Sequence, residues 1–364
     1  MDAKLFTNQS ISLSGTRLFL FLMIGLTGAA FALDAIAGRA FNQGASLTLP
    51  LWMSALATAG VGFWAVPLLR ALKVGQVIRE DGPQSHLKKA GTPTMGGAFF
   101  VPIAVAFALV LSKFSADVVA VSGLTLAYAA IGFLDDWQII RYKSNKGISP
   151  RLKMGLQIFF AAAFCVWLYV SHPASITTLA LPLGLTLPLG VLFWLLAAFT
   201  LVAESNATNL TDGMDGLAGG TVAIAFLGLG AFIGQSSPDL MIFCTSMSGG
   251  CLGFLLHNRN PARVFMGDTG SLALGGGLAA VALITNSLFA LLILSGLFFL
   301  ETVSVIAQVS YYKATKDSNG IGKRLFKMSP FHNHLELTGW TETQVVGWFY
   351  AIAALLAILS LTIR

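Results

Sequence analysis

The chain has 364 residues, of which 55% are hydrophobic and 10% charged, and its formal net charge is +6. A soluble domain carries about a quarter charged residues, so this composition excludes a water-soluble globular protein. The basic residues lie between apolar segments without aromatic interleaving, which argues against a nucleic-acid partner. The three cysteines all lie within apolar segments and form neither a disulfide framework nor a CxxC metal site.

Long apolar runs recur along the chain, each close to the ~20 residues that a helix needs to cross a bilayer. The first run has Lys4 and Arg17 before it and resembles a signal peptide, but its apolar part is too long, so we expect an uncleaved span. Segment 176–190 is too broken by Pro and Gly to span, and we expect a hairpin on the outer face. The expected spans are 18–37, 51–69, 95–112, 117–134, 155–171, 187–203, 217–234, 239–256, 271–285, 287–310 and 343–363.

These runs predict an all-α, polytopic integral membrane protein. Ten spans form a core domain over residues 46–364, and residues 1–45 form an N-terminal extension with one extra span. The loops at 70–94, 135–154, 204–216, 257–270 and 311–342 share one side and together hold 17 of the 22 Lys and Arg residues. By the positive-inside rule this side is the cytoplasm. The chemically interesting residues fall on it, which predicts a catalytic cleft on the cytoplasmic face.

Adjacent acids, Asp135 and Asp136, follow the fourth apolar run and precede several basic residues. Two carboxylates at a membrane mouth are costly unless they bind a cation or pair with bases. A charged helix end flanked by snorkelling cations is an equally good interpretation of this pair taken alone.

Polar residues recur every third position at Asn206, Asn209, Asp212 and Asp215. On a helical turn we expect this spacing to place amides and carboxylates on one face, next to the start of another helix near Leu217. This pattern favours a ligand site suited to phosphate. The alternative is an N-capping loop, but four residues in period exceed what one cap needs.

Further acids and bases follow in the later loops. Asp268 stands between glycines after Phe265, and oxygen ligands with few sulfurs or imidazoles favour Mg²⁺ or Mn²⁺; alone, a helix-capping turn is the better interpretation. His332 and His334 lie in a basic loop, where anion binding is favoured over zinc.

Lys89 and Thr94 lie in a Gly/Pro turn that could cradle a phosphate or simply form the positive end of a span. Glu301 lies inside an apolar run and is a functional candidate for that reason. Acids, amides and bases on one membrane face fit metal-assisted phosphoryl transfer.

Eight segments between about residues 73 and 348 carry a resemblance: Gly75–His86, Lys89–Gly97, Gly132–Asp136, Lys146–Lys153, Asn206–Leu217, Val264–Asp268, Glu301–Val305 and Phe326–Trp340. In this order they resemble the polyprenyl-phosphate N-acetylhexosamine 1-phosphate transferases, and specifically the phospho-N-acetylmuramoyl-pentapeptide transferases. The resemblance implies Mg²⁺-dependent transfer of phospho-MurNAc-pentapeptide from UDP-MurNAc-pentapeptide to undecaprenyl phosphate, giving lipid I and UMP. It also implies a bacterial inner membrane location, contact with membrane lipid, and a homodimer.

The resemblance also implies roles for individual residues. Asp135 resembles the acid that deprotonates the lipid phosphate, with Asp136 as its neighbour, and Asp268 resembles the Mg²⁺ ligand. His332 and His334 match the outer two of a triple histidine whose middle member is Asn333 here, which cannot carry charge. The nucleotide-side positions are Asn206, Asn209, Asp212, Asp215 and Phe265. The other cleft positions are Lys89, Thr94, Lys153 and Glu301.

We favour a one-step reaction over a covalent route through Asp268. Two alternative functions stay open from the sequence. A UDP-GlcNAc:polyprenyl-phosphate GlcNAc-1-phosphate transferase shares the acidic motifs, whereas a secondary transporter would use Glu301 and the loop acids as coupling sites. The transporter is disfavoured because the sequence shows no inverted repeat.

Overall fold

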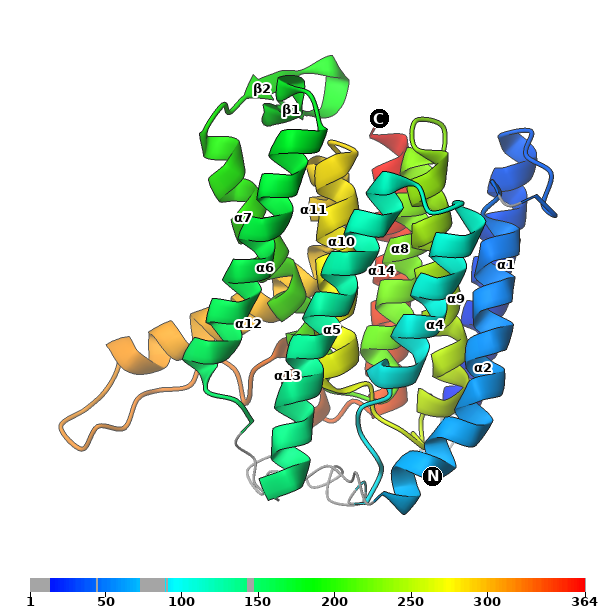
Figure 1. Ribbon diagram of the computed structural model, residues 1–364. Helices are drawn as coiled ribbons and strands as arrows, with labels where there is room; N and C mark the ends of the chain where they lie inside the picture. Colours follow the sequence, from blue (N-terminus) through cyan, green and yellow to red (C-terminus); the bar gives the residue numbers. More distant parts are fainter. Residues whose placement is uncertain (1–13, 44, 73–88, 90, 143–146, 364) are drawn as a thin grey trace, which may run out of the picture.

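The computed structural model describes residues 14–43, 45–72, 89, 91–142 and 147–363 (Figure 1). The segment Gly75–His86, which carries part of the resemblance, lies outside the described residues, as do Lys4 and Lys146. The described residues form thirteen α-helices, two short 3₁₀ turns and one two-stranded sheet. The helices are α1 (Gly15–Ile36), α2 (Thr48–Ala71), α4 (Gly97–Leu111), α5 (Ala116–Tyr142), α6 (Pro150–Ser171), α7 (Leu192–Thr211), α8 (Leu217–Ile233), α9 (Pro238–Asn258), α10 (Gly267–Ile284), α11 (Leu288–Leu294), α12 (Gly296–Ala314), α13 (Phe331–Leu337) and α14 (Glu342–Thr362).

Each expected span overlaps a helix, with two corrections. The span expected at 187–203 is shifted along the chain, because α7 covers Leu192–Thr211. The run at 287–310 forms two helices, α11 and α12, which meet at Ser295 with a bend of 71°. By length and composition seven of the described helices can cross a membrane, or eight if the bent pair is one span. Two shorter apolar helices, α4 and α8, have 15 and 17 residues. The chain is therefore an all-helical, polytopic membrane protein.

The centre of the bundle is formed by α8, α9 and α10 (Figure 1). In α9, 94% of the residues in an apolar 18-residue stretch are buried inside the protein, against 22% in α1 and 28% in each of α6 and α14. Helices approach closely where side chains are small, as at Gly249 of α9, where an added Cβ would collide with the backbone of Leu51 in α2. Backbone hydrogen bonds within each helix satisfy the polar groups that lipid cannot.

The expected hairpin is confirmed. β1 (Thr178–Ala180) pairs antiparallel with β2 (Thr186–Pro188), and Leu179 lies opposite Leu187. These strands lie at the end of the bundle opposite to the C-terminal end of α2 (Figure 1). Asn286 fixes the hairpin to the turn after α10, since its Nδ2 donates to the Thr178 carbonyl at 2.7 Å.

A buried acid that the sequence analysis did not single out ties α1 to the rest of the bundle. The Asp34 carboxylate accepts hydrogen bonds from the amide and hydroxyl of Thr48, at 3.0 and 2.7 Å, and from the Leu47 amide. It also pairs with Arg39 at 3.0 Å. Asp34 therefore holds the start of α2 from a neighbouring helix, beside the Ser46 hydroxyl, which accepts from the Leu49 amide at 3.1 Å.

Candidate active site

Asp135, Lys153 and Asp268 lie together where α5, α6 and α10 meet. The Lys153 Nζ lies 3.9 Å from Asp135 Oδ2 and forms an ion pair with Asp268 Oδ2. The Asp135 carboxylate also accepts a hydrogen bond of 3.0 Å from the Ile148 amide. The exposed fractions of the three side chains are 12, 18 and 24%, so a substrate can reach them. An ammonium group between two carboxylates can also bind a phosphate.

Asp136 faces a different partner from Asp135, because adjacent helical residues point about 100° apart. Its carboxylate accepts hydrogen bonds from the amides of Asp268 and Thr269, at 3.2 and 3.0 Å, and from the Thr269 hydroxyl at 2.7 Å. These amides belong to the first turn of α10 and have no partner within that helix. Gly267 has φ +73°, and a Cβ there would lie 2.5 Å from Asp136 Oδ2. Asp136 thus caps α10 from a neighbouring helix.

Two residues at the end of α7 also reach α10. The Asn209 Nδ2 donates to Asp268 Oδ1 at 2.8 Å and to Ser271 Oγ at 2.9 Å. Asp212 accepts a hydrogen bond from the Gly267 amide. Burial, and next the charge of Asp268 and the other nearby aspartates, raise the pKa of Asp212 to about 8. This part of the cluster therefore favours an added cation.

Lys89 and Asp215 belong to a second cluster. The Lys89 Nζ lies 2.7 Å from Asp215 Oδ1 and 2.5 Å from Glu342 Oε1. The Asn260 Nδ2 donates to both carboxylates, and the Ala262 amide donates to Asp215 Oδ2. Burial alone would lower the pKa of Lys89, but the charges of Glu342 and Asp215 outweigh it and raise the pKa. This cluster fixes the loop before α8 to the loop after α9 and to the start of α14.

Glu301 and His332 form a buried pair between α12 and α13. The His332 Nδ1 lies 3.1 Å from Glu301 Oε2, and the His332 amide donates to Oε1 at 3.2 Å. Because a carboxylate only accepts, Nδ1 carries the hydrogen. A Cβ on Gly213 would collide with His332 Nε2, so this nitrogen lies against the turn that follows Asp212.

Thr94 and Phe265 lie in two segments that pair through their backbones. The Phe265 amide donates to the Pro93 carbonyl, and the Gly96 amide donates to the Phe265 carbonyl, both at 2.8 Å. Thr94 is buried, and its hydroxyl lies 2.9 Å from where a Cβ of Gly267 would be. The start of α4 and the start of α10 are therefore held together beside the acids.

Two predicted site residues, Asn206 and His334, belong to none of these groups. The Asn206 Nδ2 donates to Gln157 Oε1 at 3.0 Å, and so Asn206 faces α6. The His334 Nδ1 accepts from the Lys327 amide at 3.2 Å, and its ring packs on Phe326. His334 follows His332 by two positions on α13, about 200° around the helix.

Besides Asp34, the sequence analysis missed two acids that make polar contacts between elements, the partly exposed Glu342 and the buried Glu204. Glu342 follows the capping residue Thr341 and has the pattern of an ordinary first-turn acid. Glu204 was assigned to a loop but lies within α7, where its Oε1 accepts a 2.5 Å hydrogen bond from Ser295 Oγ, at the bend between α11 and α12. A polar residue at the edge of an apolar run gives no signal of its depth.

The side chains around Asp268 provide oxygen ligands of the kind that Mg²⁺ prefers. Within the described residues no three acidic, histidine or cysteine side chains are arranged to hold a metal ion by themselves. Mg²⁺ usually takes one or two carboxylates and completes its shell with substrate phosphates and water. The partly exposed Asp268, beside the acid-rich end of α7, fits that requirement.

The chain matches the model of glycosyl transferase family 4 over residues 118–286 and the phospho-N-acetylmuramoyl-pentapeptide-transferase signature 1 over residues 89–101. It is 66% identical to the phospho-N-acetylmuramoyl-pentapeptide-transferase of Nostoc punctiforme, over 99% of this chain and 100% of the relative. For the enzyme of the same name from Gloeothece citriformis the identity is 59% over 100% of both chains. For that of Synechocystis sp. it is 58% over 93% of this chain and 94% of the relative.

Proposed function

The chain belongs to the phospho-N-acetylmuramoyl-pentapeptide-transferases of glycosyl transferase family 4, and from this premise we propose how its residues perform the reaction. The protein is a multi-pass bacterial membrane enzyme that makes lipid I in peptidoglycan synthesis. We propose UDP-MurNAc-pentapeptide as the donor, undecaprenyl phosphate as the acceptor, and UMP as the released product. This membership sets aside the GlcNAc-1-phosphate transferase and the transporter.

The contact of Lys153 with both Asp135 and Asp268 carries the proposed mechanism. Asp135 orients the acceptor phosphate and takes its proton where one is present. A phosphate oxygen of the acceptor then bonds to the sugar-bearing phosphorus of the donor. The bond from that phosphorus to the bridging oxygen breaks, and its electron pair leaves with UMP. Lys153 stabilises negative charge on the phosphates as it redistributes.

We assign Asp268 as the protein ligand of Mg²⁺. Asp212 lies close enough to interact electrostatically with Asp268, and its carboxylate would strengthen the binding of a cation there. The cation supplies charge neutralisation at the donor diphosphate and the leaving UMP. Asn209 holds the Asp268 carboxylate in place through Oδ1, while Oδ2 faces Lys153. Asp136 acts as a positioning residue, because it fixes the turn that carries Asp268.

The remaining predicted residues surround this centre in the proposal. Lys89 and Asp215 shape the nucleotide side by fixing the loop before α8, and Phe265 offers a half-buried ring beside it. Glu301 holds His332 against the turn after Asp212. His334 lies outside the acid cluster, where its basic loop suits a more distant part of the substrate.

We also propose the membrane arrangement. Ten spans over residues 46–364 form the transferase domain, α1 is an extra span in an extension over residues 1–45, and the acid cluster faces the cytoplasm. The cytoplasmic orientation of the acid cluster is supported by the excess of Lys and Arg in the loops on the same side of the bundle as the cluster. A homodimer in the inner membrane completes the proposal, by analogy with the family.

UMP release by the purified full-length protein tests the assignment, with undecaprenyl phosphate, Mg²⁺, and either UDP-MurNAc-pentapeptide or UDP-GlcNAc. We expect product from the muramoyl donor alone. Asp135→Asn and Asp268→Asn should each lower turnover by about 100-fold or more. Asp239→Asn is the matched control, because Asp239 is exposed in the first turn of α9.

Near-normal turnover of Asp268→Asn would contradict the metal assignment. Exchange of labelled UMP into the donor without any lipid acceptor would instead support the covalent route through Asp268. Under the one-step mechanism that exchange is absent, because the donor bond breaks only as the acceptor bond forms.

A further inference from the structure

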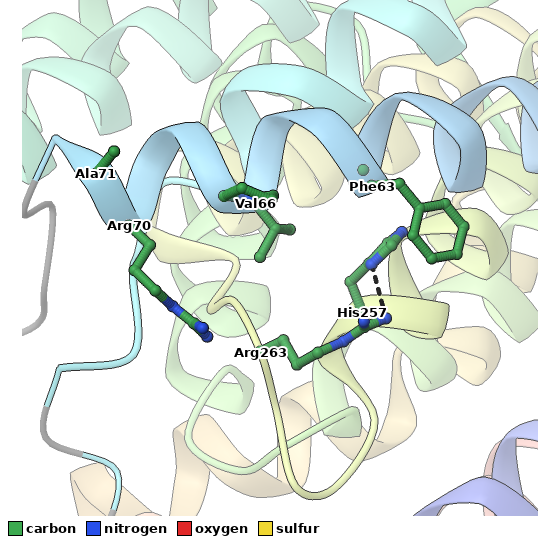
Figure 2. A pocket seen from close by; sticks show the side chains of 8 residues that line it. Phe63, Val66, Arg70, Ala71, His257 and Arg263 are labelled. Carbon is green, nitrogen blue, oxygen red and sulfur yellow. Dashed lines mark hydrogen bonds between the residues drawn. The ribbon is translucent and has the colours of Figure 1, made fainter.

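A pocket of about 380 Å³ lies between the last turns of α2 and the end of α9 (Figure 2). We call it the Arg70 pocket. It shares no lining residue with the acid cluster or with the Lys89 cluster. Its lining residues are Gly62, Phe63, Val66, Pro67, Arg70, Ala71, His257 and Arg263.

Two arginines line this pocket from different elements. Arg70 is in the last turn of α2, and Arg263 lies in the loop after α9; Figure 2 shows both side chains on the same side of α2. Across the part of the chain that the structure describes, no carboxylate lies within 4.0 Å of either guanidinium. Two cations in one cavity without a counter-ion favour an anionic ligand.

His257 does not supply the missing negative charge. Its Nε2 lies 2.9 Å from the Ala59 carbonyl, which only accepts, so Nε2 carries a hydrogen. Its Nδ1 lies 3.0 Å from Arg263 Nη2 and accepts from it (Figure 2). The imidazole is therefore neutral and serves to orient Arg263. Arg259 lies close enough for the charge of Arg263 to act on it: burial, and next that charge, lower the pKa of Arg259.

One wall of the pocket is apolar and exposed at Phe63. Phe63 is 61% exposed, and the Arg263 guanidinium lies 5.9 Å from the centre of its ring. Pro67 has no amide hydrogen, so the Phe63 carbonyl lacks its usual helical donor and can accept from a hydroxyl group. The pocket thus combines a cationic end with an apolar side that continues along α2.

We propose that the Arg70 pocket binds the head group of an anionic membrane phospholipid. The phosphodiester lies between the guanidinium groups of Arg70 and Arg263, which bind phosphate oxygens through paired N–H donors. One acyl chain follows α2 along Phe63 and Val66. Basic pockets between spans at a membrane surface bind anionic lipid in this way. A free phosphate would gain nothing from the apolar wall.

Native mass spectrometry of the full-length protein tests the proposal, after incubation with equal amounts of phosphatidylglycerol and phosphatidylcholine. We expect preferential retention of phosphatidylglycerol. Arg70→Gln should lower its occupancy about fivefold, and the double variant with Arg263→Gln about 25-fold, while Arg70→Lys retains most of it. Arg324→Gln, at an exposed arginine of the loop before α13, should leave it unchanged. Equal melting temperatures without added lipid show that the variants are folded.

Three results would overturn the proposal. The first is equal retention of the two phospholipids by the unmodified protein. The second is a loss of phosphatidylglycerol in Arg324→Gln as large as in Arg70→Gln, which would indicate a nonspecific charge effect. The third is one-for-one displacement by inorganic phosphate or by undecaprenyl phosphate, which would assign the pocket to a soluble anion or to the lipid acceptor.

Discussion

Replacing Glu301 by glutamine keeps the shape of the side chain and removes the charge that holds His332. Glu301 is fully buried and accepts from both the amide and the ring of His332, at 3.2 and 3.1 Å. A hydrogen bond to a charged group contributes about 1.5–3 kcal/mol, against about 0.5–1.5 kcal/mol for a neutral one. The variant therefore loses about 1–2 kcal/mol of the hydrogen-bond energy that holds His332 in its orientation. If this loss is felt fully in the transition state, the rate falls by about 5- to 30-fold.

The assay is the maximal rate of UMP release at saturating donor and acceptor, with the melting temperature measured alongside. If Glu301 acts through His332, the double variant Glu301→Gln/His332→Ala is no slower than His332→Ala alone. A single variant within twofold of the normal rate would refute the positioning role. A double variant slowed by the full product of both effects would show that Glu301 acts on another group.

The other predictions concern the acid cluster. Lys153→Met should lower turnover by about 100-fold or more while Mg²⁺ binding becomes tighter, because Asp268 loses its ion pair; weaker Mg²⁺ binding, measured by calorimetry, would contradict this. Gly267→Ala should lower the melting temperature and the rate together, because a Cβ would lie 2.5 Å from Asp136 Oδ2 at a positive φ; an unchanged melting temperature would contradict the close approach. In the absence of divalent cations the free energy of unfolding should fall as pH rises from about 4 to 8. Over this range Asp212 ionises in the unfolded chain, whereas in the folded protein it stays protonated up to its raised pKa of about 8. Calorimetric Mg²⁺ affinity should increase over the same range and level off above pH 8, and an affinity independent of pH would contradict this assignment.

The helices were predictable because lipid imposes one strong requirement. Each apolar run had to become a helix to satisfy its own backbone, and the runs at 18–37 and 343–363 became α1 and α14 within a few residues. The bend at Ser295 was not predicted, although the adjacent Ser295 and Gly296 within the run are a sequence signal for a kink. Its partner, Glu204, belongs to another helix, and a contact between distant segments leaves no trace in either sequence.

The site was predictable in its residue types and less so in its geometry. The run from Asn206 to Asp215 was expected to present one face, but three residues on a helix advance 300°, so each step lags by about 60°. Asn206 consequently faces α6 and Asn209 reaches Asp268, whereas Asp215 lies beyond the end of α7 and joins Lys89. Asp136 was expected only as the neighbour of Asp135 in an acidic pair, and its hydrogen bonds to the amides at the start of α10 could not be foreseen.

The cap that Asp136 places on α10 has a mechanical consequence. Asp135 is the chain neighbour of Asp136, and Asp136 accepts hydrogen bonds from the turn that carries Asp268. The separation of Asp135 and Asp268 is thus set by a short rigid path through two backbones and does not depend on how the outer helices lean. When bilayer thickness changes, tilting of the lipid-facing helix α1, which contributes no residue to the acid cluster, leaves this separation unchanged. The distance between the two acids is thereby independent of membrane thickness, although Lys153 comes from α6, another lipid-facing helix.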